Sequence, residues 1–231
     1  MNVQGAVAPV AGGKRIWIMC AIVVLLVLIV FSVRAGVSYV VQYRAHAAID
    51  LWQQSPDKQP RLNAWQDMLS SVEKALVFDV KNADLQSALA RLYFYRASNM
   101  NASTQQALQY YKQAMWHYRT VITLRPAWPY GYLNFLFGKI IVGELDAEMR
   151  QSLLHLIQLS PWEKNTLSDT VKVAVFVWPH LDKKSQQVVR PYLLLAADKR
   201  KDQVILALQE KSLKERFCKQ IVMAKLSRLC P

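Results

Sequence analysis

A run of eighteen uncharged residues near the N-terminus constrains this chain more than any other feature. Residues 16–33 read IWIMCAIVVLLVLIVFSV, with Lys14 and Arg15 before the run and Arg34 after it. At about 1.5 Å per residue, a helix of this length spans roughly 27 Å, close to the hydrocarbon thickness of a bilayer. A core helix is rarely apolar on every face over this length. The sequence therefore predicts a membrane-spanning helix.

A cleaved signal peptide is the alternative interpretation of the same run. Val33 and Ala35 satisfy the small-residue rule for cleavage. However, the run is longer than a usual signal core of about 7–15 residues, and Arg34 lies inside the would-be site. We therefore expect an anchor that stays uncleaved.

The flanking charges leave the orientation close to a tie under the positive-inside rule, because basic residues lie on both sides of the run. The tail before the anchor is short, basic and free of acidic residues, and such tails usually remain in the cytoplasm. We expect a single-pass protein with its main domain on the side of the membrane away from the cytoplasm.

Two cysteines outside the anchor, Cys218 and Cys230, form an even pair near the C-terminus, as an oxidising compartment permits. On one straight helix they would lie about 18 Å apart, beyond the reach of a disulfide. A bridge requires the chain to turn back between Ala224 and Leu229. Both alternatives stay open: a disulfide, or separate thiols with Cys230 available to pair elsewhere.

The rest of the chain is typical of an all-α protein. Glycine is scarce, with 7 residues, and apolar residues such as Trp65, Met68 and Val72 recur at steps of three and four. No segment shows sustained strand alternation. We interpret the apolar stretch 171–178 as a buried helical turn or an extended connector.

Composition and proline positions divide the chain into segments. Residues 38–52 extend the anchor as a helix, with Tyr39, Tyr43 and Trp52 suited to an interfacial aromatic belt. Two prolines in residues 55–60 predict a hinge. The predicted segments are a cytoplasmic tail (1–15), a transmembrane helix with the start of a stalk (16–41), a stalk and hinge (42–60), a tetratricopeptide-like helical domain (61–182) and a basic C-terminal segment (183–231).

The repeat assignment rests on two similar stretches that lie 35 residues apart. Leu124 and Pro126 in one match Leu159 and Pro161 in the other, and an earlier stretch around Phe78 has the same shape without the proline. A period near 34 residues is typical of tetratricopeptide helical hairpins.

Counting back from the first proline supports the same interpretation. Ala114 falls at the small position that lets two helices approach, and Tyr118 at the aromatic position beside it. Counting back from Pro161 gives Met149 where alanine is expected. The stretch 61–165 therefore resembles tetratricopeptide-like repeats, and an irregular helical bundle is the alternative.

The whole arrangement resembles the VpsP-like family of polysaccharide biosynthesis proteins, small accessory proteins of bacterial polysaccharide gene clusters. The resemblance rests on chain length, on the placement of the anchor and on the stretch 85–126. It implies an accessory role in the synthesis or export of an exopolysaccharide at the bacterial inner membrane, with the main domain in the periplasm. It supplies no catalytic residues.

The sequence contains no constellation typical of an enzyme. The phosphate-binding, dinucleotide-binding and nucleophile-elbow glycine motifs are absent. The four histidines are isolated, and none has a second histidine or a cysteine three or four residues away. We expect a non-catalytic protein without cofactor or metal.

Aromatic and arginine side chains crowd residues 91–132. Taken one at a time, these aromatic residues are best interpreted as core side chains of helical hairpins. They are too many to face the core together, and the remaining ones predict a groove that clamps a peptide or stacks on sugar rings. The primary hypothesis is therefore a scaffold or adaptor that binds another membrane or envelope protein. The candidate groove residues are Arg91, Tyr95, Tyr110, Tyr111, Arg119, Trp128 and Tyr130.

Positive charge is concentrated at the C-terminal end. Residues 183–231 contain 12 Lys and Arg against 4 Asp and Glu, in a chain of net charge +13. The segment is either a solvated face or a contact for anionic lipid or polysaccharide. The anchor argues against nucleic acid as the partner, and no feature predicts an oligomeric state. The candidate contact residues are Lys199, Arg200, Lys201, Lys211, Lys214 and Arg216.

The anchor interpretation predicts that the mature protein keeps residues 1–33 and resists extraction from membranes by high salt and carbonate. The physical reason is the uncharged run between Arg15 and Arg34. N-terminal sequencing checks it, and a mature N-terminus at Gly36 would contradict it.

Overall fold

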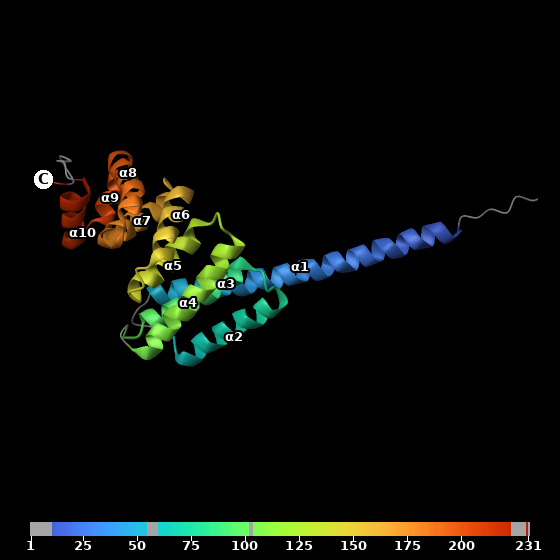
Figure 1. The fold of residues 1–231 in the computed structure, drawn as a ribbon. Helices are drawn as coiled ribbons and strands as arrows, with labels where there is room; N and C mark the ends of the chain where they lie inside the picture. The colour runs from blue at the N-terminus through green and yellow to red at the C-terminus, as the bar shows by residue number, and fades with distance from the viewer. Residues whose placement is uncertain (1–10, 55–59, 102–103, 223–229, 231) are drawn as a thin grey trace, which may run out of the picture.

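The structure is a computed structural model that describes residues 11–54, 60–101, 104–222 and 230. These residues fold into helices joined by short turns and contain no strand (Figure 1). The predicted all-α class is confirmed. The helices are α1 (Ala11–Gln54), α2 (Leu62–Phe78), α3 (Ala83–Ser98), α4 (Gln105–Leu124), α5 (Pro129–Ile141), α6 (Ala147–Leu159), α7 (Lys164–Val177), η2 (Trp178–His180), α8 (Lys183–Lys199), α9 (Lys201–Ala207), α10 (Lys211–Arg216) and η3 (Phe217–Val222).

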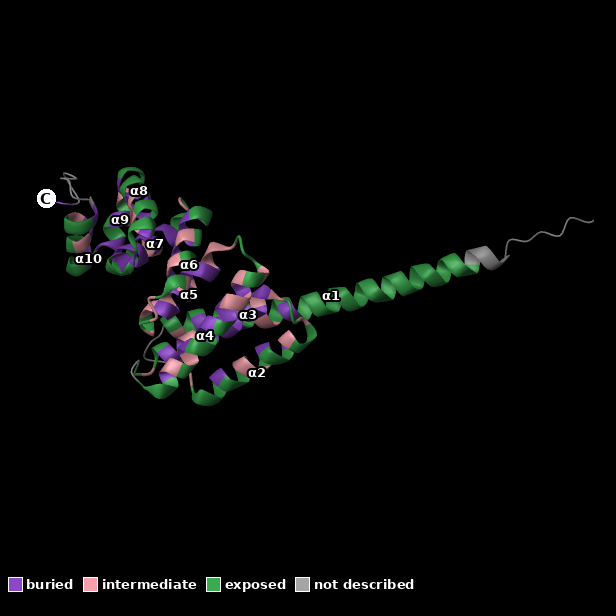
Figure 2. Ribbon diagram, viewed as in Figure 1, coloured by how far each residue is buried: buried purple, intermediate pink, exposed green. Residues whose placement is uncertain are grey.

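Helix α1 has two parts with different surroundings. Every residue from 15 to 37 is exposed, and this part projects from the domain as one rod (Figure 2). Among the described residues it is the one helix whose length and composition suit a membrane span. Further along α1, Ala45 and Ile49 are fully buried, and Val41 packs beside them against α2 and α3. The same helix therefore supplies the candidate span and a core element.

The predicted helical extension of the anchor is confirmed, but a free stalk is not what the structure contains. Residues 41, 45, 49 and 52 form one stripe along α1, and this stripe packs on the domain. Trp52 lies against Tyr95, with ring centroids 5.4 Å apart, so its predicted place in an aromatic belt is wrong. Tyr39 and Tyr43 remain exposed and stacked. The predicted hinge falls mostly on residues 55–59, outside the described residues.

The similar stretches in the sequence adopt one backbone conformation. The residues that cap the C-terminal ends of α2, α4 and α6 are Asp79, Arg125 and Ser160. Their φ/ψ angles are −138°/68°, −136°/71° and −138°/54°. At each, the N–H donates to a carbonyl four residues earlier, and a two-residue turn follows. Pro126 and Pro161 occupy the first position of that turn. The full tetratricopeptide arrangement remains a prediction.

Small residues set the spacing of the central helices. Ala90 of α3 and Ala114 of α4 are fully buried in one cluster with Met115. In α5, a Cβ added to Gly138 would lie 2.7 Å from Cγ of Met115, so glycine permits the close approach of α4 and α5. Met149, where the repeat pattern expects alanine, is fully buried in the next cluster.

The C-terminal helices form a third apolar cluster that runs from α5 to η3. The stretch 171–178 is helical and mostly buried within it. The last part of the chain is divided between two short helices: α9 begins at Lys201, and α10 begins at Lys211 after a break. Cys218 and Cys230 form a disulfide with Cα atoms 5.4 Å apart. The return between Ala224 and Leu229 lies outside the described residues.

The packing of α3 on α4 predicts the effect of a larger side chain at Ala114. Ala114→Leu should lower stability by about 1–3 kcal/mol, because the added atoms have no space in a fully buried contact. Thermal unfolding measures it, with Gln113→Leu at an exposed neighbour as the control. Equal melting temperatures for the two variants would contradict the packing.

Candidate functional site

A cleft of about 340 Å³ lies where α1, α3 and α5 meet. Three of the seven predicted groove residues line it: Arg91 from α3, and Trp128 and Tyr130 at the start of α5. The structure therefore brings together part of the predicted groove. Four further residues complete the lining of this α1–α3–α5 cleft, namely His46, Asp84, Ser87 and Asn134.

Arg91 holds one wall of the cleft together. Its guanidinium donates to Nδ1 of His46 at 2.6 Å and to Oδ1 of Asp50 at 2.5 Å. Because a guanidinium only donates, Nδ1 of His46 accepts, and the imidazole carries its proton on Nε2. Burial, together with the positive charge of Arg91, lowers the pKa of His46. The cleft therefore contains a neutral histidine at pH 7.

A second ion pair closes the neighbouring wall. Asn82 caps α3 by accepting hydrogen bonds from the N–H groups of Asp84 and Leu85 at 2.9 and 3.1 Å. The cap places Asp84 in the first turn, where Arg125 binds its two carboxylate oxygens at 2.5 and 2.6 Å. Both charges are therefore matched within the chain. The cleft offers hydrogen-bonding groups without a surplus of either charge.

Two aromatic rings form the opposite side of the cleft. Trp128 precedes α5, and Pro129 occupies the first turn, where its fixed φ suits a helix start. This start presents Trp128 and Tyr130 with ring centroids 5.6 Å apart. Both rings are half-buried, and so is Asn134 one turn further along. Such rings next to an amide can contact a peptide or a sugar.

The other four predicted groove residues pack elsewhere. Tyr95 and Tyr111 are buried, against Trp52 and Phe94 respectively. Tyr110 belongs to an aromatic cluster in which its ring centroid lies 5.6 Å from that of Trp65. Their interpretation as core side chains of the hairpins describes these three tyrosines better than the groove does. The fourth residue, Arg119, belongs to a network of charges.

That network is centred on Lys139 of α5, whose side chain is 2 % exposed. Its Nζ lies 3.0, 2.7 and 2.9 Å from carboxylate oxygens of Glu144, Asp146 and Glu148. Arg119 binds Glu148 through two hydrogen bonds of 2.6 and 2.8 Å. These bonds from Arg119, with those from Lys139, lower the pKa of Glu148 to about 2. Three helices, α4, α5 and α6, are thereby joined by paired charges.

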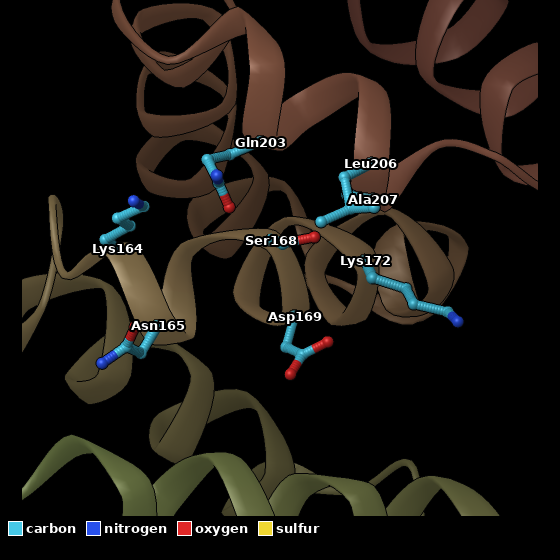
Figure 3. A pocket seen from close by; sticks show the side chains of 8 residues that line it. All are labelled: Lys164, Asn165, Ser168, Asp169, Lys172, Gln203, Leu206 and Ala207. Carbon is cyan, nitrogen blue, oxygen red and sulfur yellow. The ribbon is translucent and has the colours of Figure 1, made fainter.

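A second cleft, of about 400 Å³, lies between α7 and α9. Figure 3 shows Ser168, Asp169 and Lys172 of α7 below Gln203 and Leu206 of α9. Partial burial raises the pKa of Asp169. No predicted groove residue lies here.

The six candidate residues of the basic segment do not form one free surface. Lys199, Lys211 and Lys214 are exposed, whereas Arg200 and Lys201 are half-buried. Arg216 donates to the carbonyl of Phe176 at 2.8 Å and so fastens α10 to α7. In Figure 1 the helices that carry these cations lie at the end of the domain opposite to the projecting part of α1.

Comparisons with known proteins give no further assignment: no family model, no curated protein and no solved structure matches this chain. Within the described part of the chain, no group of three His, Cys, Asp or Glu side chains is placed to hold a metal ion. His46 and Asn134 carried no sequence signal as cleft residues, because the contact between α1, α3 and α5 brings them together.

The lowered pKa of His46 predicts a pH-dependent stability. Below pH 6.5 the unfolded chain binds a proton at this position before the folded chain does, so the free energy of unfolding falls as the pH drops. His46→Gln, which keeps an acceptor for Arg91, should lose less stability between pH 7 and 5 than the wild type. Urea midpoints at the two pH values measure this.

The lowered pKa of Glu148 acts below its ordinary value of 4.5, outside this pH window. Asp169, whose pKa burial raises, contributes equally to the wild type and to His46→Gln. His117, whose pKa burial lowers to about 4, contributes equally to both proteins. The matched control is the same substitution at exposed His180. Parallel pH dependence of the wild type and His46→Gln would contradict the prediction.

Proposed function

We propose that this protein is a non-catalytic scaffold, anchored by α1 in a bacterial inner membrane, that binds a segment of another membrane or envelope protein in the α1–α3–α5 cleft. The observation that carries the proposal is the set of helices that line the two clefts described above. The first cleft is lined by α1, α3 and the start of α5, and the second by α7 and α9, whereas a smaller cleft of about 280 Å³ lies between α1 and α2. In a stack of helical hairpins, the first helices of successive hairpins share one face, and that face commonly binds partners.

The contacts between helices support a stacked arrangement for the C-terminal half. Helix α5 contacts α7, and α6 contacts α8, as equivalent helices of neighbouring hairpins do. Helix α1 likewise contacts α3, so α1 takes the place of a first helix. The shared geometry at the ends of α2, α4 and α6 points to the same repeat.

The chemistry of the cleft favours an uncharged stretch of polypeptide as the ligand. Its two ion pairs, Arg91 with Asp50 and Arg125 with Asp84, are satisfied internally, so a charged ligand would have to displace one of them. The remaining groups are uncharged: the two rings of Trp128 and Tyr130, the amide of Asn134, the neutral imidazole of His46 and the hydroxyl of Ser87. Rings give contact area at little entropic cost, and the amide can pair with a peptide backbone.

The cellular setting follows from the anchor and from the resemblance to VpsP-like proteins. A scaffold held at the inner membrane with its domain in the periplasm could assemble enzymes or export components of an exopolysaccharide. The disulfide between Cys218 and Cys230 supports an oxidising compartment for the domain.

An alternative function is direct binding of an anionic polysaccharide by the basic C-terminal segment. The exposed cations Lys199, Lys211 and Lys214 favour it. Their position opposite to the projecting part of α1 in Figure 1 favours a polymer over the lipids of the bilayer that α1 would cross.

Site-specific photo-crosslinking in the native cells tests the cleft. A benzoyl-phenylalanine at position 134 lies in the cleft, whereas one at position 113 lies on the exposed face of α4. We expect a discrete protein adduct from position 134 only. The adduct should persist at high salt, because uncharged contacts are not screened.

Two variants sharpen the result. Tyr130→Ala removes one cleft ring and should abolish the adduct, whereas Trp116→Ala removes an aromatic that is 58 % exposed on α4 and should leave it unchanged. Equal adducts from both positions, or an adduct indifferent to Tyr130→Ala, would contradict the proposal. Loss of the adduct at high salt would favour the polysaccharide alternative.

A further inference from the structure

The turn between α2 and α3 is apolar where a turn on a soluble domain is normally polar. Val77, Phe78 and Val80 are 74 %, 63 % and 67 % exposed, and they lie within four consecutive positions. Single exposed apolar side chains are common, but three together mark a contact surface. No other part of the described domain covers them.

The position of this turn along α1 identifies what it contacts. The guanidinium of Arg34 donates a hydrogen bond to the carbonyl oxygen of Phe78. Arg34 is the first charged residue after the apolar run 16–33, so it marks the end of the hydrocarbon core if α1 spans a bilayer. The turn is therefore held beside the end of the hydrocarbon core.

The point on α1 at which the domain begins to pack also places the turn near the membrane surface. Ser38 is the first buried residue of α1, four residues beyond Arg34. Four residues of helix rise about 6 Å, and the headgroup layer on each side of a bilayer is about 5–8 Å thick. No free stalk separates the domain from the membrane, so the tip nearest to Arg34 lies within the headgroup layer.

The charges around the turn suit this environment. Lys74 and Lys81 are exposed on either side of the three apolar residues, and Arg34 lies beside them. The carboxylate in the turn, Asp79, is half-buried and accepts a hydrogen bond of 2.8 Å from Asn82. Apolar side chains ringed by cations are the pattern of an interfacial contact with anionic lipid.

We propose that the α2–α3 turn is a second membrane contact, which inserts Val77, Phe78 and Val80 at the boundary between headgroups and acyl chains beside α1. This inference rests on the membrane span proposed above. Two contacts on the same leaflet, one through α1 and one through the turn, fix the rotation of the domain about α1. The α1–α3–α5 cleft then keeps one orientation relative to the membrane.

Depth-dependent quenching in nanodiscs tests the turn with the full chain. In a Cys20→Ser background, single cysteines replace Phe78, Val80, Ile22 or Ile205 and carry the fluorophore NBD. Ile22 lies in the apolar run and serves as the reference for a label inside the bilayer. Ile205 is 50 % exposed on α9 and serves as the reference for a label in water. The nanodiscs contain phosphatidylglycerol, with doxyl-labelled lipid as the quencher at shallow or deep positions.

We expect shallow doxyl to quench the labels at 78 and 80 strongly, deep doxyl to quench the label at 22, and neither to quench the label at 205. If 22 is quenched while 78 and 80 behave like 205, the turn is outside the membrane and the inference is wrong, although the anchor stands. If 22 itself is not quenched, the span is wrong and the inference falls with it.

One outcome separates lipid from protein as the partner of the turn. A blue-shifted label at 78 that no doxyl lipid quenches would show that a second copy of the chain or another protein covers the turn, and this overturns the proposal. Adding Val77→Asp and Phe78→Asp to the label at 80 should abolish its quenching, because two carboxylates oppose insertion between acyl chains.

Discussion

The continuity of α1 is the constraint on which the rest of the molecule depends. One helix of 44 residues passes from an exposed apolar run into the domain core, with no break between them. A side chain such as Ile49 can pack in the core only if α1 keeps one rotational setting against α2 and α3. The domain is therefore rigidly connected to the apolar run, and the cleft on α1 lies at a fixed distance from it along the helix.

Ion pairs within the chain explain why the arginines of the sequence did not predict the proposed binding surface well. Arg91, Arg119 and Arg125 each bind a carboxylate of this chain, and each bond joins two helices. Lys139 binds three carboxylates while its own side chain is almost wholly buried. Removing the carboxylates around Lys139 costs more than each pair contributes, because the ammonium is then left buried without its match. The three arginine pairs are partly exposed, so each contributes less to stability, but each holds two segments in place.

Local signals predicted the fold well, and contacts between distant segments were not predicted. The two prolines 35 residues apart mark helix ends correctly, because a proline restricts its own backbone. The packing of Trp52, which is partly buried, was missed, since a tryptophan near an apolar run suits an interface as well as a core. The α1–α3–α5 cleft was found only in part for a similar reason. Trp128 and Tyr130 stand out by composition, whereas His46 becomes a cleft residue only when α1 packs on α3.

The two surfaces proposed for this protein have opposite chemistry, and this gives them separate roles. The cleft presents half-buried rings and matched charges, which suits a specific and salt-tolerant contact with one polypeptide. The α2–α3 turn presents exposed aliphatic and aromatic side chains among unmatched cations, which suits a surface as variable as lipid. Because Arg34 bonds the turn to α1 at the end of the apolar run, the proposed membrane contact of the turn would also orient α1. It would thus act on the cleft through the helix that both share.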